Sequence, residues 1–528
     1  MEHKKSSFVK QAAILAAAGI IARFIGFAYR VPLLNLIGDE GMGISSWGFN
    51  IYMLLLIISS AGLPAAISKM VSERIAVKRY KDAHRVFKVA LIVSSIVGFI
   101  ATCVLLFIAH MFFASTDQFY SIIVLVPTIF LAAVMAVFRG YFQGLKNTVP
   151  TAVSQIIEQI FNAVFSVFLA YMFLRVSLPL AAAGSNAGTG IGAFFGLLTL
   201  LVVYAVLKPN LKCSSQQEVV DLGHKHQSSF GIAKELIMTA MPIIVGVAIF
   251  SITNIIDMIM IRDRLGAIGT LSESDIMALY GQLTGKYIPI TTMPVTLAAA
   301  LAAAIIPSIA SSRVLNDTEG VKRKINIAMR LTMIMLIPAA VGIGVLSDPI
   351  LLLLFPSYPE GGELLRIGAV SIIFLSLSSI VTGMLQGMGK VYVPAIAAFC
   401  GALVKIPLNY FLISNPSLMV AGAVISTTIC YGIAALINLT VLCKTTKTVP
   451  DYMGAFIKPL AAAAVMGIAC YALYYGIYFL IPSNAIACLI SIAAGTVIYF
   501  AVMFFIGGIK REDVVLLPYG DKLARFLK

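Results

Sequence analysis

The stretch Arg139-Gly-Tyr-Phe-Gln-Gly-Leu-Lys146 has a counterpart 243 residues later, which reads Thr382-Gly-Met-Leu-Gln-Gly-Met-Gly389. A second pair lies at nearly the same offset. Ala65-Ala-Ile-Ser-Lys69 matches Ala303-Ala-Ile-Ile-Pro307, and a basic loop follows each of them. All four stretches end a long apolar run. The sequence therefore predicts two parallel repeats, related by an axis along the membrane normal.

Apolar runs extend outward from these stretches over the whole chain. Of the 528 residues, 60% are hydrophobic and 12% are charged, and the mean hydropathy is +0.98. Soluble domains carry about 25% charged residues, so composition excludes a soluble fold. A membrane-crossing helix takes about 20 apolar residues. We count fourteen such runs, at 8–35, 45–69, 85–113, 119–142, 149–174, 180–207, 234–261, 276–310, 325–346, 365–388, 391–413, 418–443, 453–481 and 484–508.

These runs predict an all-α membrane protein with about fourteen transmembrane helices, because lipid cannot satisfy the open backbone groups of other structures. The repeat divides the helices into two lobes of six, followed by two extra helices. The expected parts are an N-terminal lobe at 1–208, a cytoplasmic linker at 209–233, a C-terminal lobe at 234–445, helices 13 and 14 at 446–509, and a cytoplasmic amphipathic tail at 510–528.

The net charge of +15 is explained by topology rather than by nucleic-acid binding. With the N-terminus inside, the expected outer loops hold only four basic residues, namely Arg175, Arg262, Arg264 and Arg366. The remaining loop lysines and arginines fall inside, so we expect a multi-pass protein of the cytoplasmic membrane with both termini cytoplasmic. The first run is full-length and contains Arg23 and Arg30, which indicates that it is not a cleaved signal peptide.

Charged residues inside the runs are candidates for function, because each is costly in the bilayer. Arg23 and Arg30 are seven positions apart and share one face of the first helix. Lys286 lies in the eighth run, and Lys405 is four positions before Asn409 in the eleventh. We expect these residues to line a central cavity, although a structural partner also explains Lys405 and Asn409. A positive cavity suits a phosphate or diphosphate, which arginine binds in bidentate geometry.

Two acids also lie inside the runs. Asp257 follows Asn254 by three positions in the seventh run, and it either binds a coupling cation or forms an internal salt bridge. Glu158 shares a helix face with Asn162 in the fifth run, where a packing network between helices explains both residues equally well. These four residues form the expected coupling site or internal polar network.

The sequence contains no catalytic pattern. A Walker motif, a zinc-protease H-E-x-x-H motif and a nucleophile elbow are all missing, so we expect no enzyme, no cofactor and no metal site. Energy for transport would come from an ion gradient, the membrane potential or the substrate gradient. A channel would need rings of like side chains or carbonyls, which the runs do not show.

Four motifs carry a resemblance to a known family. They are Arg23-Phe-Ile-Gly-Phe-Ala-Tyr-Arg30, Gly62-Leu-Pro-Ala-Ala-Ile-Ser-Lys69, Arg139-Gly-Tyr-Phe-Gln-Gly144 and Ser154-Gln-Ile-Ile-Glu-Gln159. With these motifs the chain resembles the multidrug, oligosaccharidyl-lipid and polysaccharide exporter superfamily over essentially its whole length. It is most similar to the branch of stage V sporulation protein B and the lipid II flippases of spore-forming bacteria.

The resemblance implies a V-shaped pair of six-helix lobes with alternating access, and a groove for a polyprenyl tail at helices 13 and 14. The cavity arginines of the family's first helix map onto Arg23 and Arg30. The sequence departs from the family pattern at two charged positions. The second helix offers only Lys69 where Gram-negative members have a further arginine, and Lys286 stands where they have an arginine on the eighth helix.

We therefore expect a flippase for an undecaprenyl-diphosphate-linked cell-wall precursor, most of all lipid II, that acts in peptidoglycan biosynthesis, in cell shape or in sporulation. Alternatives are a flippase for another lipid-linked polysaccharide precursor, a cation-coupled multidrug exporter, and a scaffold that recruits cell-wall enzymes through its tail. The expected partners are the polyprenyl-diphosphate glycolipid, membrane lipids and cell-wall synthesis proteins. We expect a monomer that binds no nucleic acid.

Overall fold

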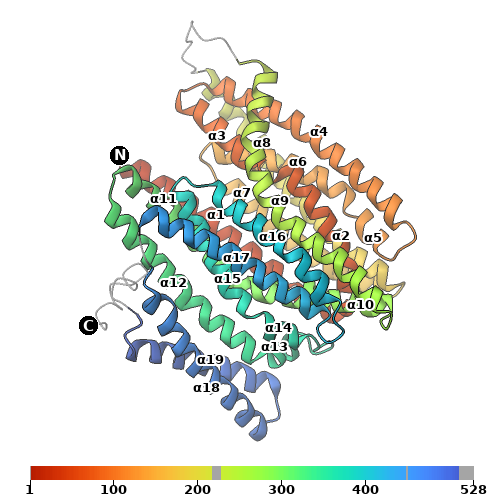
Figure 1. The fold of residues 1–528 in the computed structure, drawn as a ribbon. Helices are drawn as coiled ribbons and strands as arrows, with labels where there is room; N and C mark the ends of the chain where they lie inside the picture. The colour runs from red at the N-terminus through yellow and green to blue at the C-terminus, as the bar shows by residue number, and fades with distance from the viewer. Residues whose placement is uncertain (1, 217–226, 448–449, 510–528) are drawn as a thin grey trace. The chain divides into compact units, whose positions relative to one another are not determined.

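The chain folds into helices alone over the residues that the structure describes, which are 2–216, 227–447 and 450–509 of a computed structural model (Figure 1). The first half contains α1 (Glu2–Ala28), α2 (Arg30–Leu56), the π-helical segment η1 (Ile57–Ala61), α3 (Leu63–Ala76), α4 (Tyr80–Phe113), α5 (Gln118–Ile123), α6 (Val126–Gly144), α7 (Val149–Leu174), α8 (Leu178–Gln216) and α9 (Ser229–Ile268).

The second half contains α10 (Glu273–Gly281), the π-helical segment η2 (Gln282–Tyr287), α11 (Ile288–Val314), α12 (Thr318–Val345), α13 (Ser347–Leu354), α14 (Gly362–Gly368), α15 (Val370–Gly387), α16 (Tyr392–Ile413), α17 (Val420–Thr446), the π-helical segment η3 (Met453–Ile457), α18 (Lys458–Leu480) and α19 (Asn484–Phe505). The tail expected at 510–528 lies outside the described residues.

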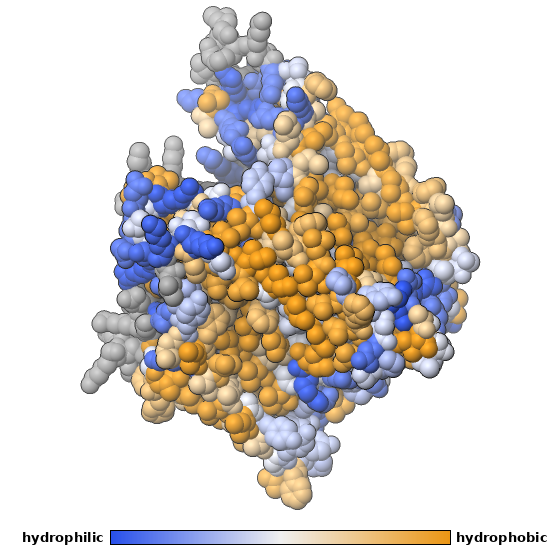
Figure 2. Space-filling view, in the orientation of Figure 1, coloured by the Kyte–Doolittle hydropathy of each residue, from blue (hydrophilic) through white to orange (hydrophobic). Residues whose placement is uncertain are grey.

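Thirteen spans in the described chain are long and apolar enough to cross a membrane, and Ile14–Ala28 forms a shorter apolar helix. Together they match the fourteen apolar runs one to one, which confirms the all-α membrane fold. Figure 2 shows hydrophobic residues covering the sides of the helices, while hydrophilic residues gather near helix ends. This distribution is that of helices whose sides face lipid and whose ends face water.

Three local boundaries differ from the sequence expectation. The expected loop between the first two runs is helical apart from Gly38, whose positive φ of 69° breaks the path inside α2. Glycine tolerates this conformation because it has no Cβ. Helix α8 continues to Gln216 and α9 begins at Ser229, so the linker expected at 209–233 carries helix at both of its ends.

The chain forms two compact units, Met1–Met258 and Ile259–Lys528. The division falls inside α9, whereas the sequence repeat suggested a boundary in the preceding linker. The first part of α9 belongs to the first unit because its apolar side chains join that unit's core, namely Ile232, Leu236 and Ala240. The boundaries drawn from the repeat remain a prediction, while the two units describe how the chain packs.

Glycines of the first repeat motif bring two helices of the first unit into close contact. A Cβ at Gly140 would lie 2.9 Å from Ile67 Cβ, and one at Gly144 would lie 2.7 Å from Val71 Cβ. Only hydrogen fits at these positions, so α6 and α3 approach closely in the manner of small-residue motifs in membranes. The surrounding core contains Met70, Phe138 and further buried apolar residues.

The counterpart motif makes the same contact in the second unit. A Cβ at Gly383 would lie 2.8 Å from Ala302 O, and one at Gly387 would lie 2.9 Å from Ile306 O. Helix α15 therefore packs against α11 as α6 packs against α3. The two stretches that match in sequence thus perform the same packing role in the two units.

Helices α18 and α19 lie outside the repeat and attach to the second unit through α12. Tyr499 of α19 donates to Ile334 O at 2.8 Å, which places its phenol inside the core. One turn earlier on α12, Arg330 Nη1 lies 3.7 Å from Asp451 Oδ2, just before η3. Arg330 is 3% exposed, so this contact fixes the start of the C-terminal helix pair.

Candidate functional site

The two arginines of the first transmembrane segment lie on either side of Tyr29, which separates α1 from α2. Tyr29 N donates to Ile25 O at 3.2 Å and Tyr29 O accepts from Leu33 N at 3.2 Å, so the helical path continues through this residue. Arg23 is exposed and Arg30 is half-buried. Neither has a hydrogen-bond or ion-pair partner among the residues that the structure describes. Two uncompensated guanidinium groups therefore sit on one membrane segment.

Helix α7 is the neighbour of this segment. A Cβ at Gly26, which lies between the arginines, would be 3.5 Å from Gln159 Oε1. At the N-terminal end of α7, Thr148 Oγ1 donates to Gln11 O of α1 at 3.0 Å. These contacts position α1, which carries Arg23, beside α7.

The carboxylate nearest to Gln159 in sequence is already neutralised. Glu158 Oε2 accepts a hydrogen bond from Arg139 Nη2 at 2.6 Å, and Arg139 Nε donates to Ser154 Oγ at 3.2 Å. The side chains of Arg139 and Glu158 are only 15% and 20% exposed. Arg139 takes part in the helix packing because α6, which continues to Gly144, carries it.

Asn162 belongs to a polar network inside the first unit. Its Oδ1 accepts from Ser166 Oγ at 2.9 Å, and the same hydroxyl lies 2.6 Å from Ser185 O. Ser45 Oγ extends the network by donating to Asn186 Oδ1 at 2.9 Å. These groups tie α2, α7 and α8 together. The packing explanation of Glu158 and Asn162 therefore accounts for all the contacts that the structure gives them.

Lys286 is not open to an anionic headgroup in this structure. Its side chain is 1% exposed, and its Nζ donates to Glu360 O at 2.9 Å and lies 6.0 Å from the ring centre of Phe355. The expectation of a cavity lysine rested on its depth in an apolar run. The structure instead directs the amine toward the backbone of the segment between α13 and α14.

The remaining candidates divide by burial. Asp257 is 7% exposed on α9, whereas Asn254, one turn before it, is exposed, so the two do not form one buried stripe. Lys405 and Asn409 are buried one turn apart on α16, at 2% and 0% exposure. Asn409 Oδ1 accepts a hydrogen bond from Ser426 Oγ of α17, which supports the structural explanation of that residue.

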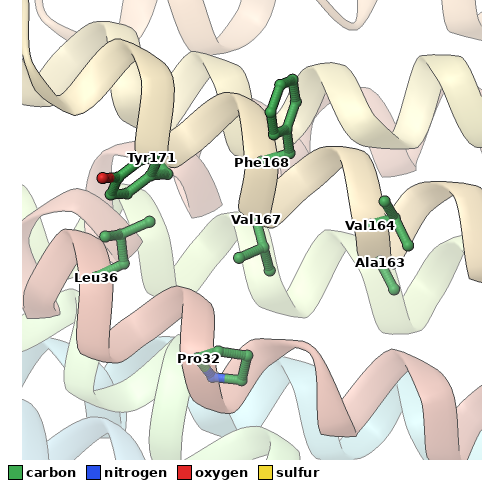
Figure 3. A pocket seen from close by; sticks show the side chains of 7 residues that line it. All are labelled: Pro32, Leu36, Ala163, Val164, Val167, Phe168 and Tyr171. Carbon is green, nitrogen blue, oxygen red and sulfur yellow. The ribbon is translucent and has the colours of Figure 1, made fainter.

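An apolar groove that the sequence analysis did not identify lies between α2 and α7 (Figure 3). Its volume is about 560 Å³, and it is lined by Pro32, Leu36, Ala163, Val164, Val167, Phe168 and Tyr171. Pro32 follows Arg30 by two positions, which places the two residues about 200° apart around the helix axis. The groove therefore faces away from Arg30.

Family models and known proteins resemble this chain over most of its length. A model described as polysaccharide biosynthesis protein matches residues 8–313, and the MatE model matches residues 242–411. Stage V sporulation protein B of Bacillus subtilis is 24% identical and covers 98% of this chain and 99% of its own length. Lipid II flippase MurJ of the same organism is 28% identical and covers 96% of each chain.

Solved structures share the fold. An inward-facing multidrug resistance MATE family transporter of the MOP superfamily aligns with a TM-score of 0.66, at 17% identity over 81% of this chain and 94% of the other. Lipid II flippase MurJ in an inward closed conformation aligns with a TM-score of 0.65, at 16% identity over 94% and 98%. The chain thus has the fold shared by these membrane transporters. Within that class, the chain belongs to the polysaccharide biosynthesis protein family.

Proposed function

We propose that this transporter moves an undecaprenyl-diphosphate-linked cell-wall precursor, lipid II, across the cytoplasmic membrane by alternating access. The observation that carries the proposal is the pair Arg23 and Arg30, which lack an acid partner within the described chain. Arginine stays charged at any physiological pH, and its planar fork matches phosphate oxygens. A diphosphate bound to both groups would supply the missing negative charge.

The ion pair at Glu158 supports this assignment. A nearby carboxylate that neutralised Arg23 or Arg30 would compete with an anionic substrate. Arg139 holds Glu158 at 2.6 Å, which leaves the arginine pair without compensation from α7. Lys286 is not part of the proposed site, because its amine is buried against Glu360 O.

Topology gives the proposed direction of transport. The positive-inside rule places both termini in the cytoplasm, since the loops on that side hold nearly all the basic residues. Lipid-linked precursors made on the cytoplasmic face would meet the arginines from that side. Rocking of the two repeats against each other would then expose the headgroup to the outer leaflet.

The substrate is tested first with the unmodified protein. In a strain depleted of its own lipid II flippases, expression of this chain should restore growth and the exposure of lipid II on the outer leaflet. If the protein inserts normally and lipid II stays inside, lipid II is excluded. The same assay with other polyprenyl-linked precursors would then identify the headgroup, because the diphosphate chemistry is shared.

A cation-coupled multidrug exporter is the second candidate, because the MatE model covers residues 242–411, a range that includes the buried Asp257. On this account Asp257→Asn abolishes drug efflux, and Arg23→Ala leaves efflux intact. The proposed flippase gives the opposite pattern in lipid translocation, in which Arg23 is essential and no drug is exported.

A further inference from the structure

The second unit contains a groove of about 700 Å³ between α12, α15 and α18. Its lining includes Asp348, Arg366, Val370, Leu460, Tyr471 and Tyr475. Polar side chains occur at one end only, where α12 ends and α13 begins. The remainder is hydrocarbon, so the groove is amphipathic along its length.

The polar end carries one positive and one negative charge. Arg366 Nη2 of α14 is paired with Asp348 Oδ2 of α13, and the two side chains are 61% and 64% exposed. This contact uses one of the five donors of the guanidinium and one of the two carboxylate oxygens. Further donors and acceptors of both signs are therefore open to a ligand at the mouth of the groove.

The mouth is held in place by neighbouring contacts. Tyr474 Oη donates to Asn484 Oδ1 at 2.9 Å, and Asn484 Nδ2 donates to Pro349 O at 3.1 Å. These bonds connect α18, α19 and the start of α13. Asp348 packs directly against Gly362, where a Cβ would collide with its carboxylate. Asp348 therefore has a defined position before any ligand binds, which lowers the entropic cost of binding.

Tyrosines mark the depth of the mouth in the membrane. The rings of Tyr471 and Tyr475 pack 4.6 Å apart and are each more than half exposed. Exposed tyrosines gather at the level of lipid headgroups. From Tyr471 the groove extends back along α18 to Leu460, and eleven residues of helix correspond to about 16 Å. This length is close to the hydrocarbon depth of one leaflet, which is about 15 Å.

We infer that this groove binds one phospholipid whose headgroup carries both a phosphate and a primary amine, with an acyl chain along α12 and α18. Arg366 binds the phosphate and Asp348 binds the ammonium group. Net charge argues for this occupant. An anionic headgroup would gain Arg366 but meet Asp348, and a diphosphate would meet the same repulsion twice over. The site therefore takes a resident lipid rather than the proposed substrate.

The binding experiment compares two lipids that differ in the headgroup amine. Protein purified in mild detergent is incubated with equal amounts of phosphatidylethanolamine and phosphatidylglycerol, and bound lipid is counted by native mass spectrometry. We expect one retained phosphatidylethanolamine, preferred by about tenfold, because the amine adds one charge-assisted hydrogen bond. Equal retention of the two lipids, or retention of an isoprenyl phosphate in their place, overturns the inference.

Two kinds of variant locate the binding site. Asp348→Asn and Arg366→Gln change exposed side chains and should remove the headgroup preference without loss of fold. Val370→Trp fills the groove from a half-exposed position and should abolish retention of either lipid. Val391→Trp is the matched control, since Val391 is similarly exposed but lies outside the groove. Unchanged lipid retention in Val370→Trp would contradict the proposed location.

Discussion

Arg139 on α6 and Glu158 on α7 are joined by a hydrogen-bonded ion pair of 2.6 Å, in which both side chains are mostly buried. The pair removes the one carboxylate of α7 from competition with a substrate anion. It also fixes the fifth transmembrane span to the fourth. Stability measurements on variants test the packing role, and translocation measurements test the neutralisation of Glu158.

The first prediction concerns this ion pair. Arg139→Gln or Glu158→Gln alone should lower stability by about 1–3 kcal/mol, because each leaves a buried charge without its partner. The double variant should be more stable than the sum of the two losses predicts, by an interaction energy of about 0.5–3 kcal/mol. Thermal unfolding of the three variants in detergent measures this. Strict additivity would show that the pair contributes nothing as a pair.

A second prediction tests the structural role of Lys286. Lys286→Met should lower stability by about 1–3 kcal/mol, because it leaves Glu360 O without the donor that the structure gives it. Translocation per folded molecule should be unchanged, because the amine does not reach the substrate. Lys322→Met is the control, since its exposed pair with Glu319 contributes at most about 1 kcal/mol. Loss of translocation at normal stability would return Lys286 to the substrate site.

A third prediction concerns the repeated glycines. Gly140→Ala and Gly383→Ala should each lower the unfolding midpoint, because the new Cβ would lie within 3 Å of atoms on the facing helix. Gly476→Ala has open space around it and should be neutral or stabilising by up to about 1 kcal/mol, the usual difference between glycine and alanine in a helix. Destabilisation of only one of the two motif variants would contradict their equivalent packing.

The fold was largely predictable from the sequence for physical reasons. A membrane span needs a long apolar run, so hydropathy located all fourteen helices even though the edges moved by several residues. The repeat was visible because glycines such as Gly140 and Gly383 cannot be replaced where helices touch. The break at Gly38 was not predicted, since an isolated glycine inside an apolar run is equally compatible with unbroken helix.

The candidate site was predictable only in part. Arg23 and Arg30 stood out because charge inside an apolar run is rare. Arg139 was not identified as the partner of Glu158, because the two residues lie 19 positions apart on different helices and no local pattern connects them. Lys286 was assigned to the cavity because its partner could not be recognised from the sequence. Its partner is a backbone carbonyl, which every residue has and which leaves no signal in the sequence.

The most direct test of the central claim measures outer-leaflet lipid II in the flippase-depleted strain that expresses the Arg23→Ala, Arg30→Ala double variant. Each arginine is expected to supply charge-assisted contacts of about 1.5–3 kcal/mol to the diphosphate, so translocation should fall by about a hundredfold or more. Arg175→Ala, which changes an exposed arginine bonded to Tyr171 Oη, should keep full translocation. Full lipid II exposure by the double variant, at normal expression, would contradict the proposed mechanism.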